Sequence, residues 1–411
     1  MKKFAVLGCG VVGSGVVELF EKNKALIEKR SGRKLEMAYI LDLRDFPDRP
    51  YGSKVVKSID TILADPEVTV VAECMGGIEP AFTFVKACLE AGKSVATSNK
   101  ELVAAKGDIL LQTAKDHHCN FFFEASVGGA IPIIRPLHKC LAANDFSAIA
   151  GILNGTTNFI LGKMITADMD FASALALAQE KGYAEKDPTA DVEGHDACRK
   201  ICFLSSLAFG KHVYPESVHT KGIREVELKD VKLCMQLGYA IKLIARVQRL
   251  ENGKILPTVM PMAVADDNLL SDVNGVYNAV MVRGDGISKA MFYGRGAGKF
   301  PTASAVLGDM IEEVQLSDTI PAQTWENVGS ADFIEDFSQF SAERYFRTSA
   351  ANAEALTEVF GEGVSEILTM DDHESVFTVA REMNVTEVED AVKALSAKGI
   401  RVLAEYPILQ P

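Results

Sequence analysis

The sequence is poor in cysteine and has no surplus of basic residues. Its 411 residues include only eight cysteines, and no two of them form a C-x-x-C pair. This usage favours reduced, buried thiols in a cytosolic protein over disulfides or a zinc site. The 43 Lys and Arg residues against 56 Asp and Glu residues give a net charge of −13, which argues against a protein that binds a nucleic-acid backbone.

Long apolar runs are also absent. No stretch approaches the ~20 uninterrupted apolar residues that a membrane-spanning helix needs. The apolar run that begins at Phe4 stops at Gly8 and is too short for a signal peptide. The sequence therefore predicts a cytoplasmic protein with no membrane segment. A hydrophobic share of 48% can fill several cores, and the length predicts about two to four domains.

The first third of the chain alternates short apolar runs with helical patterns, which is typical of a parallel α/β sheet. Strands are expected at residues 4–7, 35–41, 68–73, 94–97 and 120–124, and helices at residues 14–29, 59–64, 81–91 and 106–117. We therefore expect a Rossmann-type, doubly wound parallel sheet.

After about residue 130 the pattern changes to that of an inserted α+β domain. Strands are expected at residues 148–153, 256–262 and 276–282, a turn at 154–158, and helices at 171–181 and 196–209. The acidic loop at 183–194 separates two well-patterned helices, a common place for function. The helix expected at 304–314 should pack back onto the first domain. The last ~70 residues, after a strap at 316–340, predict a split βαβ order, βαββαβ.

A glycine-rich motif lies between the first expected strand and the first expected helix. It reads G-x-G-x-x-G and consists of Gly8, Cys9, Gly10, Val11, Val12 and Gly13. In that context it predicts binding of NAD or NADP, because the glycines allow a tight turn, close approach of a pyrophosphate and helix–strand packing. The backbone amides at the start of the helix would bind the diphosphate.

Four further residues are candidate cofactor contacts. Asp42 ends the second strand and favours NAD, because a carboxylate repels a 2′-phosphate, whereas Arg44 could bind that phosphate. The choice between NAD and NADP therefore stays open. Gly76 and Lys100 follow the next two strands at the usual ligand side of such a sheet.

Asp196 and Lys200 are four residues apart at the start of a predicted helix and share one face. A lysine in a partly dry pocket beside a carboxylate is a plausible acid/base for an alcohol dehydrogenase. The alternative is an exposed ion pair worth about 0.3–0.5 kcal/mol. The spacing alone leaves both open.

The residues around this pair resemble the signature of homoserine dehydrogenase. Residues 182–200 read GYAEKDPTADVEGHDACRK, and the resemblance also rests on ILNGTTN at 152–158, EASVGGAIP at 124–132, TSNK at 97–100 and YGRGAG at 293–298. It extends to about residue 315. It implies reduction of aspartate 4-semialdehyde to homoserine by NAD(P)H, in threonine, methionine and isoleucine biosynthesis.

The resemblance also implies roles for individual residues. Lys200 would be the proton donor and acceptor, Asp196 would orient it and the substrate hydroxyl, and Glu185 would hold the substrate amino group. Asp191, Thr156 and Tyr183 would line the same pocket, and Gly182 and Gly298 would lie near the nicotinamide. A monovalent cation, sodium or potassium, would bind at Glu124, Val127, Gly129 and Ile131, mostly through backbone carbonyls.

The C-terminal βαββαβ segment is similar to the ACT modules that regulate this family by binding amino acids. Residues 349–352 read SAAN where such modules carry an acidic–Pro–Gly turn, so the tail could bind a threonine effector or serve only assembly into a homodimer or homotetramer. The domain boundaries expected are 1–130 for dinucleotide binding, 131–302 for catalysis and dimerisation, 303–340 for the return helix and linker, and 341–411 for the ACT-like domain.

Two other functions are to be weighed against this one. An aspartate-semialdehyde dehydrogenase would need a nucleophilic cysteine near a histidine, and Cys119 follows His117 and His118. A non-catalytic regulator that senses a dinucleotide would use the first domain and the tail but leave the 185–200 segment without a role.

Overall fold

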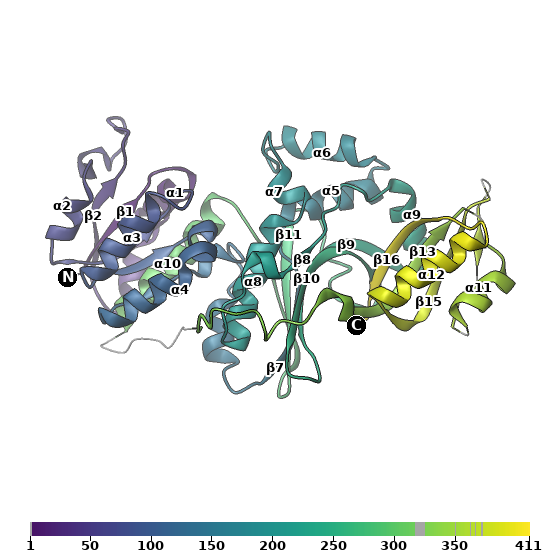
Figure 1. Cartoon of the computed structure of the whole chain (residues 1–411). Helices are drawn as coiled ribbons and strands as arrows, with labels where there is room; N and C mark the ends of the chain where they lie inside the picture. The colour runs from purple at the N-terminus through teal and green to yellow at the C-terminus, as the bar shows by residue number, and fades with distance from the viewer. Residues whose placement is uncertain (1, 317–324, 350, 362, 366, 371–372) are drawn as a thin grey trace. The chain divides into compact units, whose positions relative to one another are not determined.

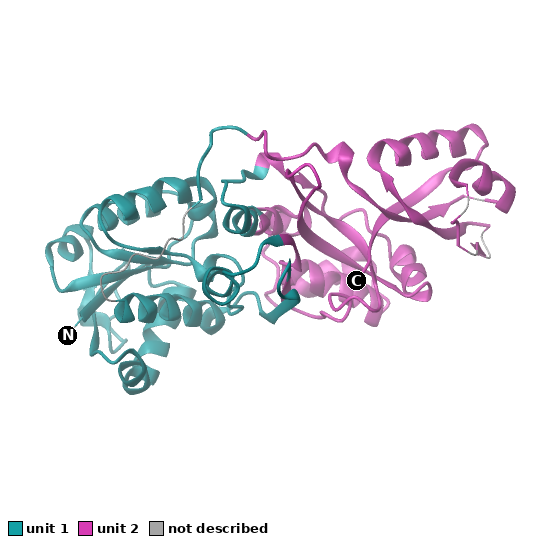
Figure 2. Cartoon of the chain, turned by 90° about the horizontal axis from the view of Figure 1, so that it is seen from below, with its two compact units in different colours: residues 1–146, 202–215, 282–330 teal, residues 147–201, 216–281, 331–411 magenta. Residues whose placement is uncertain are grey.

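The computed structural model describes residues 2–316, 325–349, 351–361, 363–365, 367–370 and 373–411. The chain forms two compact units, each assembled from three separate stretches (Figure 2). Unit 1 consists of Met1–Phe146, Cys202–Pro215 and Val282–Ser330, and unit 2 of Ser147–Ile201, Glu216–Met281 and Ala331–Pro411. No helix in the described part of the chain combines the length and the apolar character that a membrane crossing requires.

Unit 1 contains a parallel sheet with the strand order β3-β2-β1-β4-β5-β6. Its strands are β1 (Lys2–Leu7), β2 (Leu35–Leu41), β3 (Val55–Val56), β4 (Val68–Glu73), β5 (Ser94–Thr97) and β6 (Phe121–Phe122). This is the order of a Rossmann-type sheet, so the expected fold of the first part is confirmed. The order reverses between β1 and β4, where such sheets bind their ligands.

The helices of unit 1 cover this sheet. They are α1 (Val11–Ser31), α2 (Ile59–Ala64), α3 (Ala81–Glu90), α4 (Lys100–Asp116) and α10 (Lys299–Gln315), and the strand β12 (Ser288–Arg295) precedes α10. Val306 and Met310 of α10 share one apolar core with Phe4 of β1 and Phe20 of α1. The late helix therefore packs back onto the first strands, as its amphipathic pattern predicts.

Unit 2 begins with a second sheet, in which β11, β7, β9 and β10 are neighbours in that order. The elements here are β7 (Phe146–Ile152), α5 (Gly155–Thr166), α6 (Phe171–Glu180), α7 (Thr189–Val192), α8 (His195–Phe209), β8 (His219–Thr220), α9 (Leu228–Gln236), β9 (Tyr239–Arg249), β10 (Ile255–Ala265) and β11 (Tyr277–Gly284). α9 and β9 are not among the elements expected from the sequence.

The turn expected at 154–158 is wrong, because these residues begin the helix α5. The side-chain oxygen of Asn154 accepts a hydrogen bond from the Thr157 N–H (2.9 Å), which makes Asn154 the N-cap. Asparagine is favoured both in turns and at N-caps, so the polar run is ambiguous by itself. The buried Phe159 and Ile160 on the next turn favour the helix.

The last elements of unit 2 form a βαββαβ fold (Figure 1). The order of its strands in the sheet is β16-β13-β15-β14. They are β13 (Ser341–Thr348), α11 (Ala353–Phe360), β14 (Leu368–Thr369), β15 (Ser375–Asn384), α12 (Val385–Ala397) and β16 (Val402–Leu409). Phe346 and Phe377 of the sheet share a core with Leu356 of α11 and Leu395 of α12. The predicted order of these elements is confirmed.

This C-terminal fold is continuous with the second sheet of unit 2. β16 pairs in parallel with β10, with Ile408 opposite Ala263 and Leu409 opposite Val264. In addition, Arg347 of β13 forms an ion pair with Asp230 of α9. Strand pairing and a buried ion pair therefore both tie the C-terminal fold to the rest of the unit.

Candidate active site

The glycine-rich turn of unit 1 has the geometry that a dinucleotide needs. Gly8 adopts φ +85, and a Cβ there would lie 2.9 Å from Cγ of Met75. A Cβ on Gly13 would lie 1.9 Å from the carbonyl oxygen of Gly8, so only glycine allows this close approach of helix to strand. At Gly10 a Cβ would meet nothing within 4 Å. Val11 and Val12 follow as the first residues of α1.

Asp42 and Arg44 form an ion pair beside this turn. The Asp42 carboxylate accepts the Cys9 N–H (2.8 Å) and two hydrogen bonds from the Arg44 guanidinium (3.0 and 2.9 Å). The guanidinium holds the pKa of Asp42 well below its usual range. Arg44 is exposed. The carboxylate is therefore neutralised by the same residue that could bind a phosphate.

Lys57 is a second cation beside Asp42 and Arg44, and the sequence does not predict it there. Its ammonium donates to the backbone carbonyls of Asp42 (3.2 Å), Leu43 (3.2 Å) and Arg44 (2.9 Å). It belongs to no motif and is far from Asp42 along the chain, so no local signal could have found it.

Glu73 was also missed, although it is the last residue of β4, at the edge where ligands bind. It is 0% exposed, and its carboxyl group accepts the Met75 N–H (2.7 Å) and the Thr97 hydroxyl. Burial raises the pKa of Glu73 to about 7, against the opposing effect of the hydrogen bonds from Thr97, Met75 and Asn99. This carboxyl therefore titrates near neutral pH between the Met75–Gly77 and Ser98–Asn99 segments.

Glu73→Gln is expected to stabilise the protein increasingly as the pH rises. Because folding raises the pKa of Glu73, its contribution to stability is full below the unfolded pKa and is lost as the pH rises through about 7. The loss amounts to about 3 kcal/mol at most. Thermal unfolding midpoints at several pH values between about 5 and 8 check this, with Glu21→Gln on the exposed face of α1 as control. A pH-independent difference between Glu73→Gln and wild type would contradict it.

The remaining candidate cofactor residues lie in both units. Lys100 is the first residue of α4, and Asn99 caps that helix. A Cβ on Gly76 would meet nothing within 4 Å. Gly298 immediately precedes α10 in unit 1, whereas Gly182 follows α6 in unit 2. Gly76 thus leaves room for a ligand at the end of β4.

Unit 2 buries the Lys200–Asp196 pair. The Lys200 ammonium lies 2.9 Å from Oδ2 of Asp196 and donates to the Leu153 carbonyl at 2.7 Å. The two side chains are only 8% and 3% exposed. The alternative of a solvent-exposed surface pair is therefore wrong. An ammonium has three N–H donors, so one remains for a substrate oxygen.

Asn154 joins two of the predicted carboxylates. Its side-chain amide donates to Oδ1 of Asp191 at 2.6 Å and to Oδ2 of Asp196 at 2.9 Å. Asn154 belongs to the ILNGTTN motif, whose polar residues predict a turn and assign it no role. The one signal in the sequence is that an asparagine, which has two amide N–H donors, lies in a motif that accompanies the acidic segment.

The other substrate candidates lie around the start of α5 and the loop before α7. The Thr156 hydroxyl donates to the Tyr183 carbonyl at 2.8 Å, and the Tyr183 ring packs edge-on against Phe159, 5.0 Å between ring centroids. Glu185 is exposed and its backbone carbonyl accepts from Gln179. Thr156, Tyr183, Asp191, Asp196 and Lys200 are thus linked through Asn154, Leu153 and α5, with Glu185 two residues from Tyr183.

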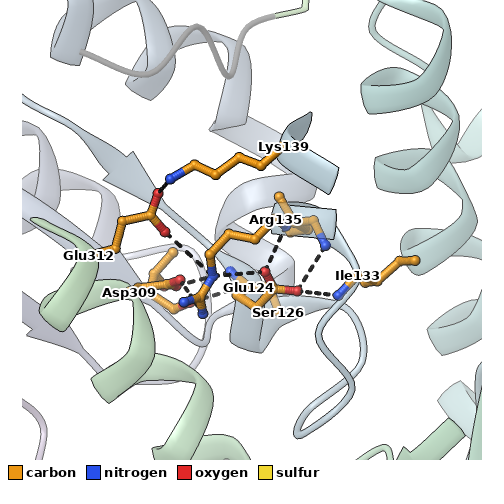
Figure 3. Close-up of polar contacts among 9 residues, drawn as sticks. Glu124, Ser126, Ile133, Arg135, Lys139, Asp309 and Glu312 are labelled. Carbon is orange, nitrogen blue, oxygen red and sulfur yellow. Dashed lines mark hydrogen bonds and ion pairs between the residues drawn. The ribbon is translucent and has the colours of Figure 1, made fainter. Parts of the chain in front are cut away.

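Glu124 belongs to a buried charged cluster of unit 1, shown in Figure 3. Its carboxylate accepts the N–H groups of Ile133 (2.6 Å), Ile134 (2.8 Å) and Arg135 (2.9 Å). The Arg135 guanidinium lies between Glu124, Asp309 and Glu312, at 3.3, 3.1 and 3.5 Å. The Glu124 carboxylate therefore already binds three backbone amides and Arg135, so only the backbone carbonyl of Glu124 would be free to bind a cation.

The backbone near Glu124 fits a cation with oxygen ligands. Val127, Gly129 and Ile131 are buried, and no backbone N–H of the described residues outside helices and strands donates to their carbonyl oxygens. Carbonyl oxygens of buried residues usually have a donor, and a hard monovalent cation would be a suitable partner for these oxygens.

Cys119 lacks the properties of a nucleophile. It is buried, its thiol lies 3.4 Å from the Leu89 carbonyl, and burial raises its pKa to about 12. A nucleophilic cysteine needs a lowered pKa and access to substrate. The cysteine-dependent alternative therefore finds no support at this residue.

A Rossmann-type sheet with a glycine-rich turn, together with a buried lysine–carboxylate pair in a second unit, defines a dinucleotide-dependent dehydrogenase. Residues 8–124 match the NAD binding domain of homoserine dehydrogenase, and residues 132–311 match homoserine dehydrogenase itself. The chain belongs to the homoserine dehydrogenase family, and its activity is NAD(P)-dependent homoserine dehydrogenation.

Individual relatives agree with this assignment. The homoserine dehydrogenase of Lactococcus lactis is 40% identical over 317 residues, which cover 76% of this chain and 74% of that one. That of Corynebacterium glutamicum is 34% identical over 96% of this chain and 92% of its own. The crystal structure of the Thiobacillus denitrificans homoserine dehydrogenase has a TM-score of 0.88 and 30% identity, and the match covers 100% of this chain and 98% of that chain.

A shorter relative, a hyperthermophilic archaeal homoserine dehydrogenase, was solved in complex with NADPH. Its TM-score is 0.64 at 28% identity, and the match covers 76% of this chain and 98% of that chain. Nearly the whole archaeal chain is therefore matched by about three quarters of this one.

Proposed function

We propose that Lys200 transfers the proton in the interconversion of aspartate 4-semialdehyde and homoserine. The observation that carries this is the buried ammonium, with two of its donors held by Asp196 and the Leu153 carbonyl and the third available. In the reducing direction, the bound NAD(P)H supplies hydride to the aldehyde carbon. Lys200 donates a proton to the aldehyde oxygen as negative charge develops there, and Asp196 keeps the ammonium oriented. Turnover of a Lys200→Ala variant tests this.

The same pocket suits an amino-acid substrate. The exposed carboxylate of Glu185 and the carboxylate of Asp191 would receive the substrate ammonium. The N-terminal amides of α5, near Thr156, would receive its carboxylate, since helix N-termini favour anions. Tyr183 would line the pocket through its contact with Thr156.

For the cofactor we propose a preference for NADP. Arg44 is exposed and pairs with Asp42, and the exposed Lys57 lies beside it in an ion pair with Asp45, so two cationic side chains stand where the 2′-phosphate would bind. The glycine-rich turn at Gly8, Gly10 and Gly13 would hold the diphosphate. The archaeal relative in complex with NADPH supports the same choice.

Arg44→Ala is expected to raise the KM for NADP by about 10- to 100-fold, as the loss of a charge-assisted hydrogen bond predicts. The KM for NAD should change much less, because removing the cation leaves Asp42 free to contact a ribose hydroxyl. Steady-state kinetics with both cofactors check this, with the exposed Arg33→Ala as control. An equal change for NADP and NAD would contradict the preference.

Sodium or potassium would be held by the carbonyls of Val127, Gly129, Ile131 and Glu124, where it would brace the turn after β6 without taking part in proton transfer. The burial of these residues, and the lack of a backbone N–H donor to the carbonyls of Val127, Gly129 and Ile131 outside the described helices and strands, support this proposal. Activity and thermal unfolding in sodium, potassium and a large organic cation test it, since equal values in all three would exclude a functional cation.

The βαββαβ fold at 341–411 would be an ACT-like domain that either binds threonine or serves assembly into a homodimer or homotetramer. Equilibrium binding of threonine to the full chain separates the two, because only sensing requires binding.

We further propose a cytoplasmic location, on the basis of the eight free cysteines. For the domain boundaries, we propose that residues 131–302 form the catalytic part and that residues 303–340 form the return helix and the linker.

A further inference from the structure

Asn154 has a fixed orientation because its two side-chain ends bind different partners. The oxygen caps α5 by accepting the Thr157 N–H (2.9 Å) and lies 3.1 Å from the Thr157 hydroxyl. The nitrogen must then point away from the helix, toward Asp191 (2.6 Å) and Asp196 (2.9 Å). The side chain is buried.

The peptide segment of Leu153 and Asn154 contacts both members of the Lys200–Asp196 pair. The Leu153 carbonyl accepts from the Lys200 ammonium at 2.7 Å, and the Asn154 amide donates to the Asp196 oxygen that also faces that ammonium. Oδ2 of Asp196 thus faces both the Asn154 amide and the Lys200 ammonium. Its charge is shared between the amide and the ammonium.

We infer that Asn154 is a positioning residue of the dehydrogenase reaction, which holds Asp196 so that Lys200 keeps its orientation and its readiness to release a proton. The inference rests on the proposed role of Lys200. Without the amide, Asp196 would turn fully to Lys200 and bind the ammonium more strongly. The charged groups around this amide are Asp191 from α7 and Asp196 with Lys200 from α8.

Two substitutions separate positioning from helix capping. Serine and aspartate are both good N-caps, but neither offers the amide donors. Asn154→Ser removes the donors and keeps a cap, whereas Asn154→Asp also places a third carboxylate beside Asp191 and Asp196. Asn384 provides matched controls, because it caps α12 by accepting the Glu387 N–H at 2.9 Å.

Asn154→Ser is expected to lower kcat by about 10- to 100-fold, the usual cost of misplaced groups at a reaction centre. The pH dependence of kcat should shift upward by about one pH unit, because a less solvated Asp196 strengthens the hold on the Lys200 proton. Asn154→Asp should lose more turnover. The Asn384→Ser and Asn384→Asp proteins should keep wild-type kcat and pH profile.

Two results would overturn the inference: wild-type kcat in Asn154→Ser, or a lower kcat with an unshifted pH profile, which marks a merely structural role. If Asn154→Ser does not fold, Asn154→Asp is judged by the same pH criterion. Failure of the Lys200 proposal is distinguishable, because it appears as near-wild-type turnover of Lys200→Ala whatever the Asn154 variants do.

Discussion

Lys200→Ala is expected to lower kcat by about 10²- to 10⁴-fold, the range that a positioned general acid contributes. Binding of NAD(P) should change little, because the glycine-rich turn lies in unit 1 and Lys200 in unit 2. The measurement is steady-state formation of NAD(P)H from homoserine, together with titration of the cofactor against the folded variant.

Stability needs a control in this experiment, since removal of Lys200 leaves the buried Asp196 without its cation. Breaking a buried pair costs about 3–5 kcal/mol. Lys242→Met provides a matched control: Lys242 is also buried, and it donates to the Val273 carbonyl (2.7 Å) and to Asn274 (3.0 Å). Its loss should lower stability but leave the kcat of the folded protein within a few-fold of wild type. Lys200→Ala with turnover as high as that control would remove Lys200 from the mechanism.

Arg347→Met is expected to lower the free energy of unfolding of unit 2 by about 3–5 kcal/mol. Arg347 binds both oxygens of Asp230, at 2.8 and 2.9 Å, and the Tyr345 hydroxyl donates to the same carboxylate at 3.1 Å. The two side chains of the pair are 4% and 1% exposed. The substitution leaves a buried carboxylate unpaired, and that desolvation is the physical reason for the cost.

The double variant Asp230→Leu with Arg347→Met should recover most of this stability, because apolar residues of similar size often replace a buried pair without loss. Arg381→Met is the control, since its pair with Glu387 is exposed and is expected to cost less than about 1 kcal/mol. Chemical unfolding of the four proteins gives the comparison. A loss for Arg347→Met no larger than for Arg381→Met would show that the buried pair does not hold the C-terminal fold.

Local patterns predicted the parallel sheet well. β2, β4 and β5 begin and end where the apolar runs predict, because strands buried on both faces form continuous apolar segments bounded by turn residues. The helix α5 was missed since its first residues are polar and include glycine, and only the packing of Phe159 and Ile160 reveals it. Strand β9 and helix α9 were missed although Gly238 separates them and Asn252-Gly253, a typical hairpin turn, joins β9 to the antiparallel β10.

The candidate site divides in the same way. The spacing of Asp196 and Lys200 is a local property of one helix, and the glycine positions follow from the covalent geometry of one turn. Both are therefore readable from the chain alone, as is membership of the family through its motifs. Burial of the lysine–carboxylate pair is not a local property. The sequence alone therefore does not distinguish an exposed ion pair from a catalytic one, and the fold does.

Contacts between distant segments required the tertiary structure. The Leu153 carbonyl accepts from Lys200, the Asn154 amide bridges Asp191 and Asp196, and Arg347 pairs with Asp230, 117 residues earlier in the chain. The neutral-range titration of Glu73 likewise arises from its surroundings. Side-chain chemistry is encoded residue by residue, but desolvation and long-range hydrogen bonding exist only once the elements have packed.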